Sequence, residues 1–248
     1  MTQKEQLTKE DLVADILGSV PEEVVTEAEL PSRCLFYTLD DPSRPVEIRP
    51  MTFEDERGLA SMGAGQSAKA LDYLISRCTS NINPSQLLEM DKMYILIKIR
   101  EISYGEAFNA DITCPNCKGS QSITIDISKL QVNKIPEDLK DPREIHLPVC
   151  DKKAVVRFSR SKDLQYISSP EKLADNLWRF VNSIDGCTDS KVISDVLKKL
   201  PLRDMHSILE GLNQNKYGVQ TKFIYVCEGC DTETQTEVPF NETFFTMS

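Results

Sequence analysis

The sequence lacks any run approaching the about 20 consecutive apolar residues that a membrane-spanning helix needs. Its longest apolar run covers residues 93–97, resumes at Ile99 after Lys98, and then meets two charged residues. The run therefore predicts a buried helix. No secretory signal segment is recognisable near residue 1, so we expect synthesis and folding in the cytoplasm.

Residue patterns that mark a catalytic site are also scarce. The sequence has no glycine-rich phosphate loop, no low-complexity tract and no arrangement typical of a Cys/His/Asp nucleophile. Its two histidines, His146 and His206, lie in a strand-like and a helical run, and we interpret both as packing residues. The adjacent acids at 54–56 are interpreted as charges at the start of a helix. We therefore expect a protein that is not an enzyme.

What the sequence does contain is a pair of Cys-x-x-Cys motifs in similar surroundings. Cys114 and Cys117 form one motif, and Cys227 and Cys230 form the other. Each motif lies between two short runs in which apolar and polar residues alternate, as in a β-strand. A strand, a two-thiol knuckle and a second strand make half of a zinc ribbon. Four thiolates complete the tetrahedral shell of a structural Zn²⁺ and leave no position for substrate water, so we predict one structural zinc per chain.

Other uses of these thiols stay open at this point. A thioredoxin-like redox motif usually places its first cysteine at a helix N-terminus, whereas both motifs here lie between strand-like runs. Local disulfides need an oxidising compartment, of which the sequence shows no sign. Iron is a minor substitute for zinc. Lys118 and Lys222 are candidates for offsetting the negative charge of four thiolates. The other cysteines have no paired spacing and are predicted to be buried free thiols: Cys34, Cys78, Cys150 and Cys187.

Basic residues are too few for an evident nucleic-acid-binding face. The net charge is −10, and residues 1–30 account for −6 of it, with eight acids and two lysines. Phosphate neutralisation needs clustered cations, so we expect no nucleic-acid partner. The alternative is a zinc-ribbon nucleic-acid-binding or transcription-related factor. It would need a basic patch formed by Lys129, Lys134, Lys152, Lys153, Arg157 and Arg160.

Patterning predicts an α+β fold with a split zinc-ribbon-like β core and a helical insertion between the two knuckles. We divide the chain into four parts. Residues 1–29 form an acidic N-terminal arm, and residues 30–130 form a hairpin-plus-helix segment that ends in the first knuckle. Residues 131–218 form an inserted strand and helical segment, and residues 219–248 form the second knuckle with a C-terminal strand. An N-terminal β-hairpin is predicted to pair 35–39 with 46–49. Helices are predicted from the Thr52 cap, at 68–78, from the Ser85 cap to about 103, and at 170–183, 189–199 and 201–213.

The acidic arm contains one amphipathic stretch. Leu12, Val13, Ile16 and Leu17 share one face at helical spacing. This spacing predicts a short helix that docks in a groove of a partner protein. The alternative is an arm that is solvated and partly disordered.

One ordered set of segments has a counterpart in a known family. The segments cover 30–37, 46–52, 70–75, 91–105 and 113–117. Taken in this order, over roughly residues 28–130, the chain resembles the baseplate hub proteins of T4-like contractile-tailed bacteriophages. The resemblance implies a structural subunit or assembly chaperone that contacts other phage baseplate hub proteins. It implies a location in the host cytoplasm during assembly and in the virion tail baseplate, and no catalytic residues.

Overall fold

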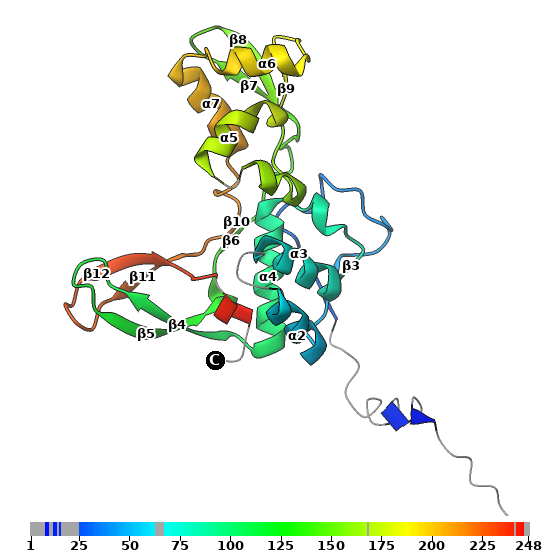
Figure 1. Ribbon diagram of the computed structural model, residues 1–248, viewed down its shortest axis with the longest axis vertical. Helices are drawn as coiled ribbons and strands as arrows, with labels where there is room; N and C mark the ends of the chain where they lie inside the picture. The colour runs from blue at the N-terminus through cyan, green and yellow to red at the C-terminus, as the bar shows by residue number, and fades with distance from the viewer. Residues whose placement is uncertain are drawn as a thin grey trace, which may run out of the picture.

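The computed structural model describes residues 8, 9, 12, 13, 15, 25–62, 67–167, 169–240 and 242–245. These residues form a mixed α and β protein with helices α2–α7 and several small antiparallel sheets. Figure 1 shows three parts: a central body around α4, an arm of two long hairpins projecting to one side, and a distal unit at the top of the view. None of the described helices is long and apolar enough to cross a membrane.

The central body is organised around α4 (Glu89–Tyr104), which carries the apolar run seen in the sequence. Ile95 and Ile99 of this helix are completely buried, as that run predicts. The predicted cap at Ser85 is wrong, because the fully buried Leu87 and Leu88 separate a short 3-10 turn from the start of α4. The other elements here are β1 (Thr26–Glu27), β2 (Glu47–Ile48), α2 (Phe53–Ser61), α3 (Ser67–Cys78), β3 (Thr79–Ser80) and η2 (Pro84–Gln86).

The predicted N-terminal hairpin is wrong. Residues 35–39 form no strand, and β2 instead pairs antiparallel with β1 on one side and β3 on the other. The reason lies in the aromatic side chains of the predicted first strand. Phe36 and Tyr37 pack against a separate cluster around Phe158, and the Tyr37 hydroxyl donates to Asp91 Oδ2 at 2.5 Å. These contacts hold the segment away from β2.

The distal unit is a three-stranded antiparallel sheet covered by helices, with its own core. The predicted helix at 170–183 is only partly correct, because it ends at Asn176 and the chain then forms a 3-10 turn and a sheet strand. Phe180 and Val181 are buried in this core, and Val181 lies opposite Val156 of the neighbouring strand. The elements are β7 (Arg143–Leu147), β8 (Lys152–Val156), η4 (Ser161–Tyr166), α5 (Pro170–Asn176), η5 (Leu177–Phe180), β9 (Val181–Ile184), α6 (Ser190–Leu197) and α7 (Leu202–Leu212).

A small apolar cluster joins the distal unit to the central body. Its buried members are Leu88, Met90, Ile135 and Phe158. Backbone pairing crosses the same junction, because Ser161 N donates to Leu87 O at 2.8 Å. Two short strands, β6 (Val132–Asn133) and β10 (Gly218–Val219), pair beside it where the chain enters and leaves the distal unit. The predicted helices at 189–199 and 201–213 are confirmed as α6 and α7.

Gly218 of β10 is required where the chain passes the start of α4. Its φ is +78°, and a Cβ there would lie 2.8 Å from Met90 Cβ and 3.1 Å from Met90 O. We expect Gly218→Ala to lower the free energy of unfolding by about 2 kcal/mol, from backbone strain plus the clash. Gly186 is the matched control, since its φ is +80° and no atom of the described residues lies within 4 Å of an added Cβ. Gly186→Ala should cost only about 1 kcal/mol in the same urea unfolding experiment. Equal costs would contradict the close approach to Met90.

Candidate metal centre

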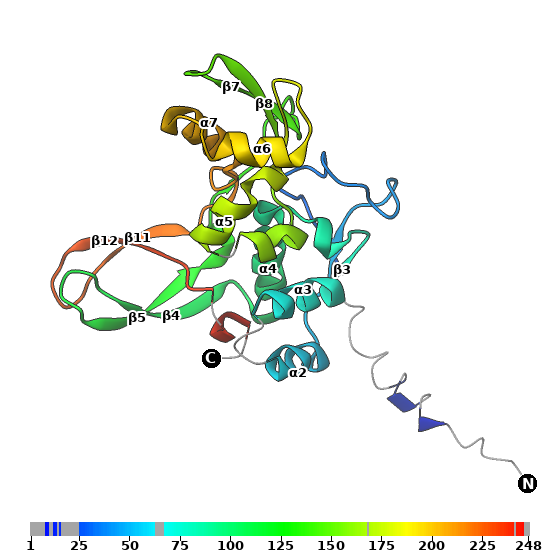
Figure 2. The ribbon, with the colours of Figure 1, turned by 45° about the horizontal axis from the view of Figure 1, so that its top comes forward.

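Two hairpins form the projecting arm, which we call the hairpin arm (residues 107–126 and 222–237). The first hairpin pairs β4 (Ala107–Thr113) with β5 (Ser120–Asp126), and the second pairs β11 (Lys222–Val226) with β12 (Glu233–Glu237). Figures 1 and 2 both show the hairpins extending side by side from the central body. Strict alternation explains their packing, because Phe108, Ala110 and Ile112 are buried while the residues between them are exposed.

Each Cys-x-x-Cys motif forms the tip of one hairpin, and the two tips have the same backbone geometry. Lys118 N donates to Cys114 O at 2.9 Å, and Asp231 N donates to Cys227 O at 2.8 Å. Lys118 and Asp231 both have positive φ, 63° and 52°. The repeated spacing in the sequence therefore reflects a repeated turn, which points two sulfurs from each tip toward the other.

The four sulfurs, which we call the thiol cluster (Cys114, Cys117, Cys227 and Cys230), all lie within 4.8 Å of one another. Two of the distances between the hairpins are 3.9 Å, for Cys114 with Cys230, and 3.6 Å, for Cys117 with Cys227. Tetrahedral zinc with Zn–S bonds of about 2.3 Å separates its sulfurs by about 3.8 Å. A disulfide would need about 2.05 Å. The residues thus fit a four-coordinate metal ion and are not drawn together as disulfides.

Polar groups from one hairpin reach sulfurs of the other. Asn116 Nδ2 lies 3.6 Å from Cys230 Sγ and 3.1 Å from Thr232 Oγ1. The Thr232 hydroxyl, 3.4 Å from the same sulfur, together with the Thr232 N–H and Asn116, lowers the pKa of Cys230 to about 6. The backbone N–H of Cys117 likewise lowers the pKa of Cys114. Such donors stabilise thiolates, the form of cysteine that binds metal. At Cys227 the Gly229 N–H acts in the same direction, but burial and the neighbouring thiols outweigh it and raise the pKa to about 11.

The buried side of the thiol cluster is small and contains one unsatisfied hydroxyl. Tyr225 Oη is buried and has no hydrogen-bond partner among the described residues. Burial and then the neighbouring Cys114 raise the pKa of Tyr225. A metal-bound thiolate at Cys114 would give this hydroxyl an acceptor. Ile112 is the other buried apolar neighbour among the described residues, and Ile123 and Phe223 pack half-buried against it, so a small apolar cluster joins the two hairpins beside the thiols.

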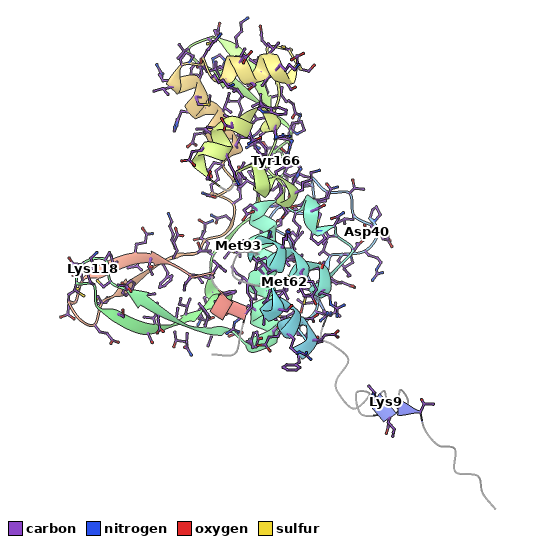
Figure 3. All side chains as sticks on the ribbon, in the orientation of Figure 1. Lys9, Asp40, Met62, Met93, Lys118 and Tyr166 are labelled. Atoms are coloured by element: carbon purple, nitrogen blue, oxygen red, sulfur yellow. The ribbon has the colours of Figure 1, made fainter. Side chains whose placement is uncertain are left out.

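The two lysines that the sequence suggested as neighbours of the thiolates lie at opposite ends of the hairpin arm. Lys118 follows Cys117 and lies at the outer end of the hairpin arm (Figure 3). Lys222 lies at the opposite end of β11 from the cysteines and pairs with Glu237 at 3.5 Å. Asn116 and Thr232 also reach the cluster. They carry no spacing signal, because their contacts cross between hairpins 116 residues apart in sequence.

The remaining predicted site residues are not at the thiol cluster. Leu12 and Val13 of the acidic N-terminal arm are each 47% exposed, and Ile16 and Leu17 lie outside the described residues. None of the eight cysteines forms a disulfide among the described residues. Of the four outside the two motifs, Cys78 is buried as predicted, Cys34 and Cys187 are half-buried, and Cys150 is exposed. The predicted packing role of His146 and His206 is wrong, because both side chains are exposed. His146 Nε2 lies 3.8 Å from Asp151 Oδ1, and His206 Nε2 lies 3.9 Å from Glu210 Oε1.

The six cations of the alternative nucleic-acid patch are each paired with a carboxylate at 2.5–2.8 Å. The pairs are Lys129 with Asp126, Lys134 with Glu29, Lys152 with Asp185, Lys153 with Glu144, Arg157 with Asp163, and Arg160 with Asp141. They are also distributed from the short 3-10 turn that follows β5, which contains Lys129, through the junction to the distal unit. The charge that phosphate would neutralise is therefore already balanced within the chain.

Comparison with known proteins gives one match. A family model described as T4 bacteriophage base plate protein matches residues 35–246. The matched range includes both hairpins, the thiol cluster and the distal unit between them. No curated protein and no solved structure matches the chain.

Proposed function

The chain belongs to the family of T4 bacteriophage base plate proteins, and from this premise we propose that it helps to build the central hub of the tail baseplate. It acts as a structural subunit or assembly chaperone, through contacts with other baseplate hub proteins and without catalysis. The observation that carries the proposal is the family match over nearly the whole described chain. The resemblance of residues 28–130 to hub proteins supports the choice of the hub within the baseplate.

In this proposal the metal is structural zinc, one ion per chain. Four sulfur ligands favour zinc or iron, and a closed shell of four protein ligands leaves no position for a substrate. The ion joins the two hairpin tips into one arm, in a split zinc-ribbon-like arrangement. The long insertion between the halves of the motif is the distal unit and its junction.

Exposed apolar side chains supply candidate contact surfaces for assembly. On the distal unit, Leu202 is 86% exposed, and Val149 and Val192 are about half exposed. A groove of about 360 Å³ lies beside them, lined by residues that include Val192, Val196 and Leu200. The amphipathic stretch at Leu12 and Val13 is a second candidate surface. The nucleic-acid alternative gains no support, because its cations are paired.

Native mass spectrometry of the chain co-expressed with the other baseplate proteins of the same phage tests this function. We expect one zinc per chain and a hetero-complex of defined stoichiometry. Leu202→Glu should weaken the complex by about tenfold if the distal surface is a contact, since a buried charge without a partner is costly. Leu35, 49% exposed on the central body, is the control, and Leu35→Glu should leave the complex intact. A chain that remains alone in every combination would contradict the proposed function.

A further inference from the structure

A groove of about 580 Å³ lies between the two hairpins of the arm and extends from Glu228, inside the second Cys-x-x-Cys motif, to Lys129 and Leu130 beyond the end of β5. Its lining includes five consecutive residues of β5, 122–126, and three consecutive residues of β11, 223–225. Successive side chains of a strand point to opposite faces. A groove lined by consecutive residues of a strand therefore meets the edge of that strand. The edges of β5 and β11 face each other across this groove.

The register of the first hairpin shows which backbone groups of β5 point into the groove. Cys114 N donates to Gly119 O at 2.9 Å, so these residues form a hydrogen-bonded pair. Antiparallel pairs alternate between hydrogen-bonded and non-hydrogen-bonded. By this alternation, Ser122 and Thr124 direct their N–H and C=O groups away from β4. The side chain of Thr124 agrees, because its hydroxyl lies 2.8 Å from Asn109 Oδ1, a contact typical of the closer non-hydrogen-bonded pairs.

The second hairpin has the same arrangement. Cys227 N donates to Thr232 O at 3.1 Å, so the alternation turns the backbone groups of Ile224 and Val226 away from β12. Among the described residues, no hydrogen bond is made by the outward backbone groups of Ile224 or of the opposing Thr124. Both strands thus present unpaired donors and acceptors to the same groove.

The side chain of Gln121 already bridges the two edges at the end near the metal. Its Oε1 accepts from Glu228 N at 2.9 Å, and its Nε2 reaches Val226 O at 3.5 Å. Gln121 thus makes two contacts from one side chain with outward backbone groups at the end of β11. An added strand would make the same kind of contact along the rest of that edge.

The two edges carry few of the features that usually prevent strand addition. β5 and β11 contain no proline and one charged residue each, Asp126 and Lys222. Ile224 and Val226 are 62% and 59% exposed, although they lie on a strand. In contrast, two of the five residues of β12, at the opposite edge, are glutamates. The edge that faces away from the groove is therefore more strongly charged than the two edges that line it.

Charge indicates the kind of segment that fits. The hairpin arm contains six acids and two lysines, and the charged residues that line the groove itself are Asp126, Lys129 and Glu228. Lys129 is paired with Asp126, and Lys222 of the arm is paired with Glu237, so neither lysine offsets Glu228. Four thiolates around Zn²⁺ add a further formal charge of about −2. The groove therefore favours a segment with basic residues.

We propose that the groove between β5 and β11 receives an extended segment of a partner baseplate protein, in which basic and apolar residues alternate, as an added β-strand. Main-chain hydrogen bonds to both edges supply affinity, and the acidic surroundings and exposed Ile224 select the alternating sequence. This assignment rests on the proposed function, because the partner is another baseplate protein.

The test uses the full-length, zinc-loaded chain and overlapping 12-residue peptides from the baseplate proteins of the same phage. Fluorescence anisotropy should find a basic, alternating peptide that binds. Ile224→Pro removes an N–H that points into the groove and leaves the ladder bonds to β12 in place. It should weaken that binding by at least about tenfold. Gln235, directly opposite Ile224 on β12, is the control, and Gln235→Pro should change the affinity by less than about twofold.

Zinc content and thermal melting will show whether Ile224→Pro folds. If it does not, a second pair of variants tests the same proposal. Thr124→Pro should abolish binding, and Asn109→Pro, opposite it on β4, should not. Hydrogen exchange should slow at Ser122, Thr124 and Ile224 when the peptide binds.

Three outcomes would overturn the strand proposal. They are no binding by any peptide, equal loss in both members of a variant pair, and a dimer of the chain that Ile224→Pro abolishes. The last would assign the groove to a second copy. If Ile224→Pro leaves the hetero-complex of full-length proteins intact, the strand proposal fails and the proposed function stands. If the wild-type chain forms no complex at all, both fail.

Discussion

Replacing Cys114 with serine should release the metal and lower the free energy of unfolding by about 4 kcal/mol, when free zinc stands about 1,000-fold above its dissociation constant. The expectation follows from how little else joins the hairpin tips. Among the described residues, Ile112 and Tyr225 are buried beside the thiols, with Ile123 and Phe223 half-buried against them, and the polar contacts of Asn116 and Gln121 are exposed. Serine keeps the size of the side chain but supplies no thiolate, so the tetrahedral shell cannot close.

Thermal melting with and without EDTA, together with zinc content from native mass spectrometry, measures this effect. Wild type in EDTA should melt where Cys114→Ser melts, and EDTA should not change the variant. Cys150→Ser is the control, because Cys150 is an exposed free thiol of the distal unit. It should bind one zinc and melt like wild type. A Cys114→Ser protein that melts like untreated wild type would refute a structural metal ion at this site.

The meeting of the four thiols was predictable from sequence because both halves of the site carry the same local code. Each motif has a two-residue gap and flanking alternation, and these determine a turn at a hairpin tip without reference to the rest of the chain. The long separation between Cys117 and Cys227 did not matter, since the insertion folds on its own sheet. The local pattern does not predict the contacts between the two tips. Asn116 and Gln121 have no distinguishing sequence pattern, because their partners belong to the other hairpin.

The predictions from sequence were wrong where packing against distant residues overrode a local pattern. Residues 35–39 alternate like a strand, but Tyr37 binds the buried Asp91 and Phe36 packs near Phe158, both far along the chain. The helical spacing at 170–183 was overridden in the same way, because β8 offers a free edge to which Val181–Ile184 pairs. Helix starts were predicted more reliably when the cap was local, as at Thr52, whose side chain accepts from Asp55 N.

Asp55 should prove the most important single charge of the central body. Its side chain is completely buried, yet it accepts from Arg49 Nη1 at 2.8 Å and Arg77 Nε at 2.9 Å, and it completes the capping box of α2. Burial acts to raise the pKa of Asp55, but the hydrogen bonds from Arg49, the Thr52 backbone and Arg77 outweigh it. They hold the pKa well below its ordinary 3.8.

Asp55→Asn should therefore lower the free energy of unfolding at pH 7 by about 2 kcal/mol, the loss of hydrogen bonds between charged groups. The cost is less than for a fully enclosed ion pair, because Arg77 is 45% exposed and regains water. The control is Glu54→Gln, which removes the same charge from an exposed position in the same helical turn. It should change stability by no more than about 0.5 kcal/mol in urea unfolding.

The pH dependence gives a second, independent measure of the same carboxylate. Because the pKa of Asp55 is lower in the folded protein than in the unfolded chain, its contribution is fully present above about pH 5. It is lost as the pH falls below 3.8 toward the folded-state pKa, since the unfolded chain then binds the proton first. The gap in stability between wild type and Asp55→Asn should accordingly narrow from pH 7 to pH 3. A gap that stays constant over this range would mean that Asp55 contributes through packing and not through its charge.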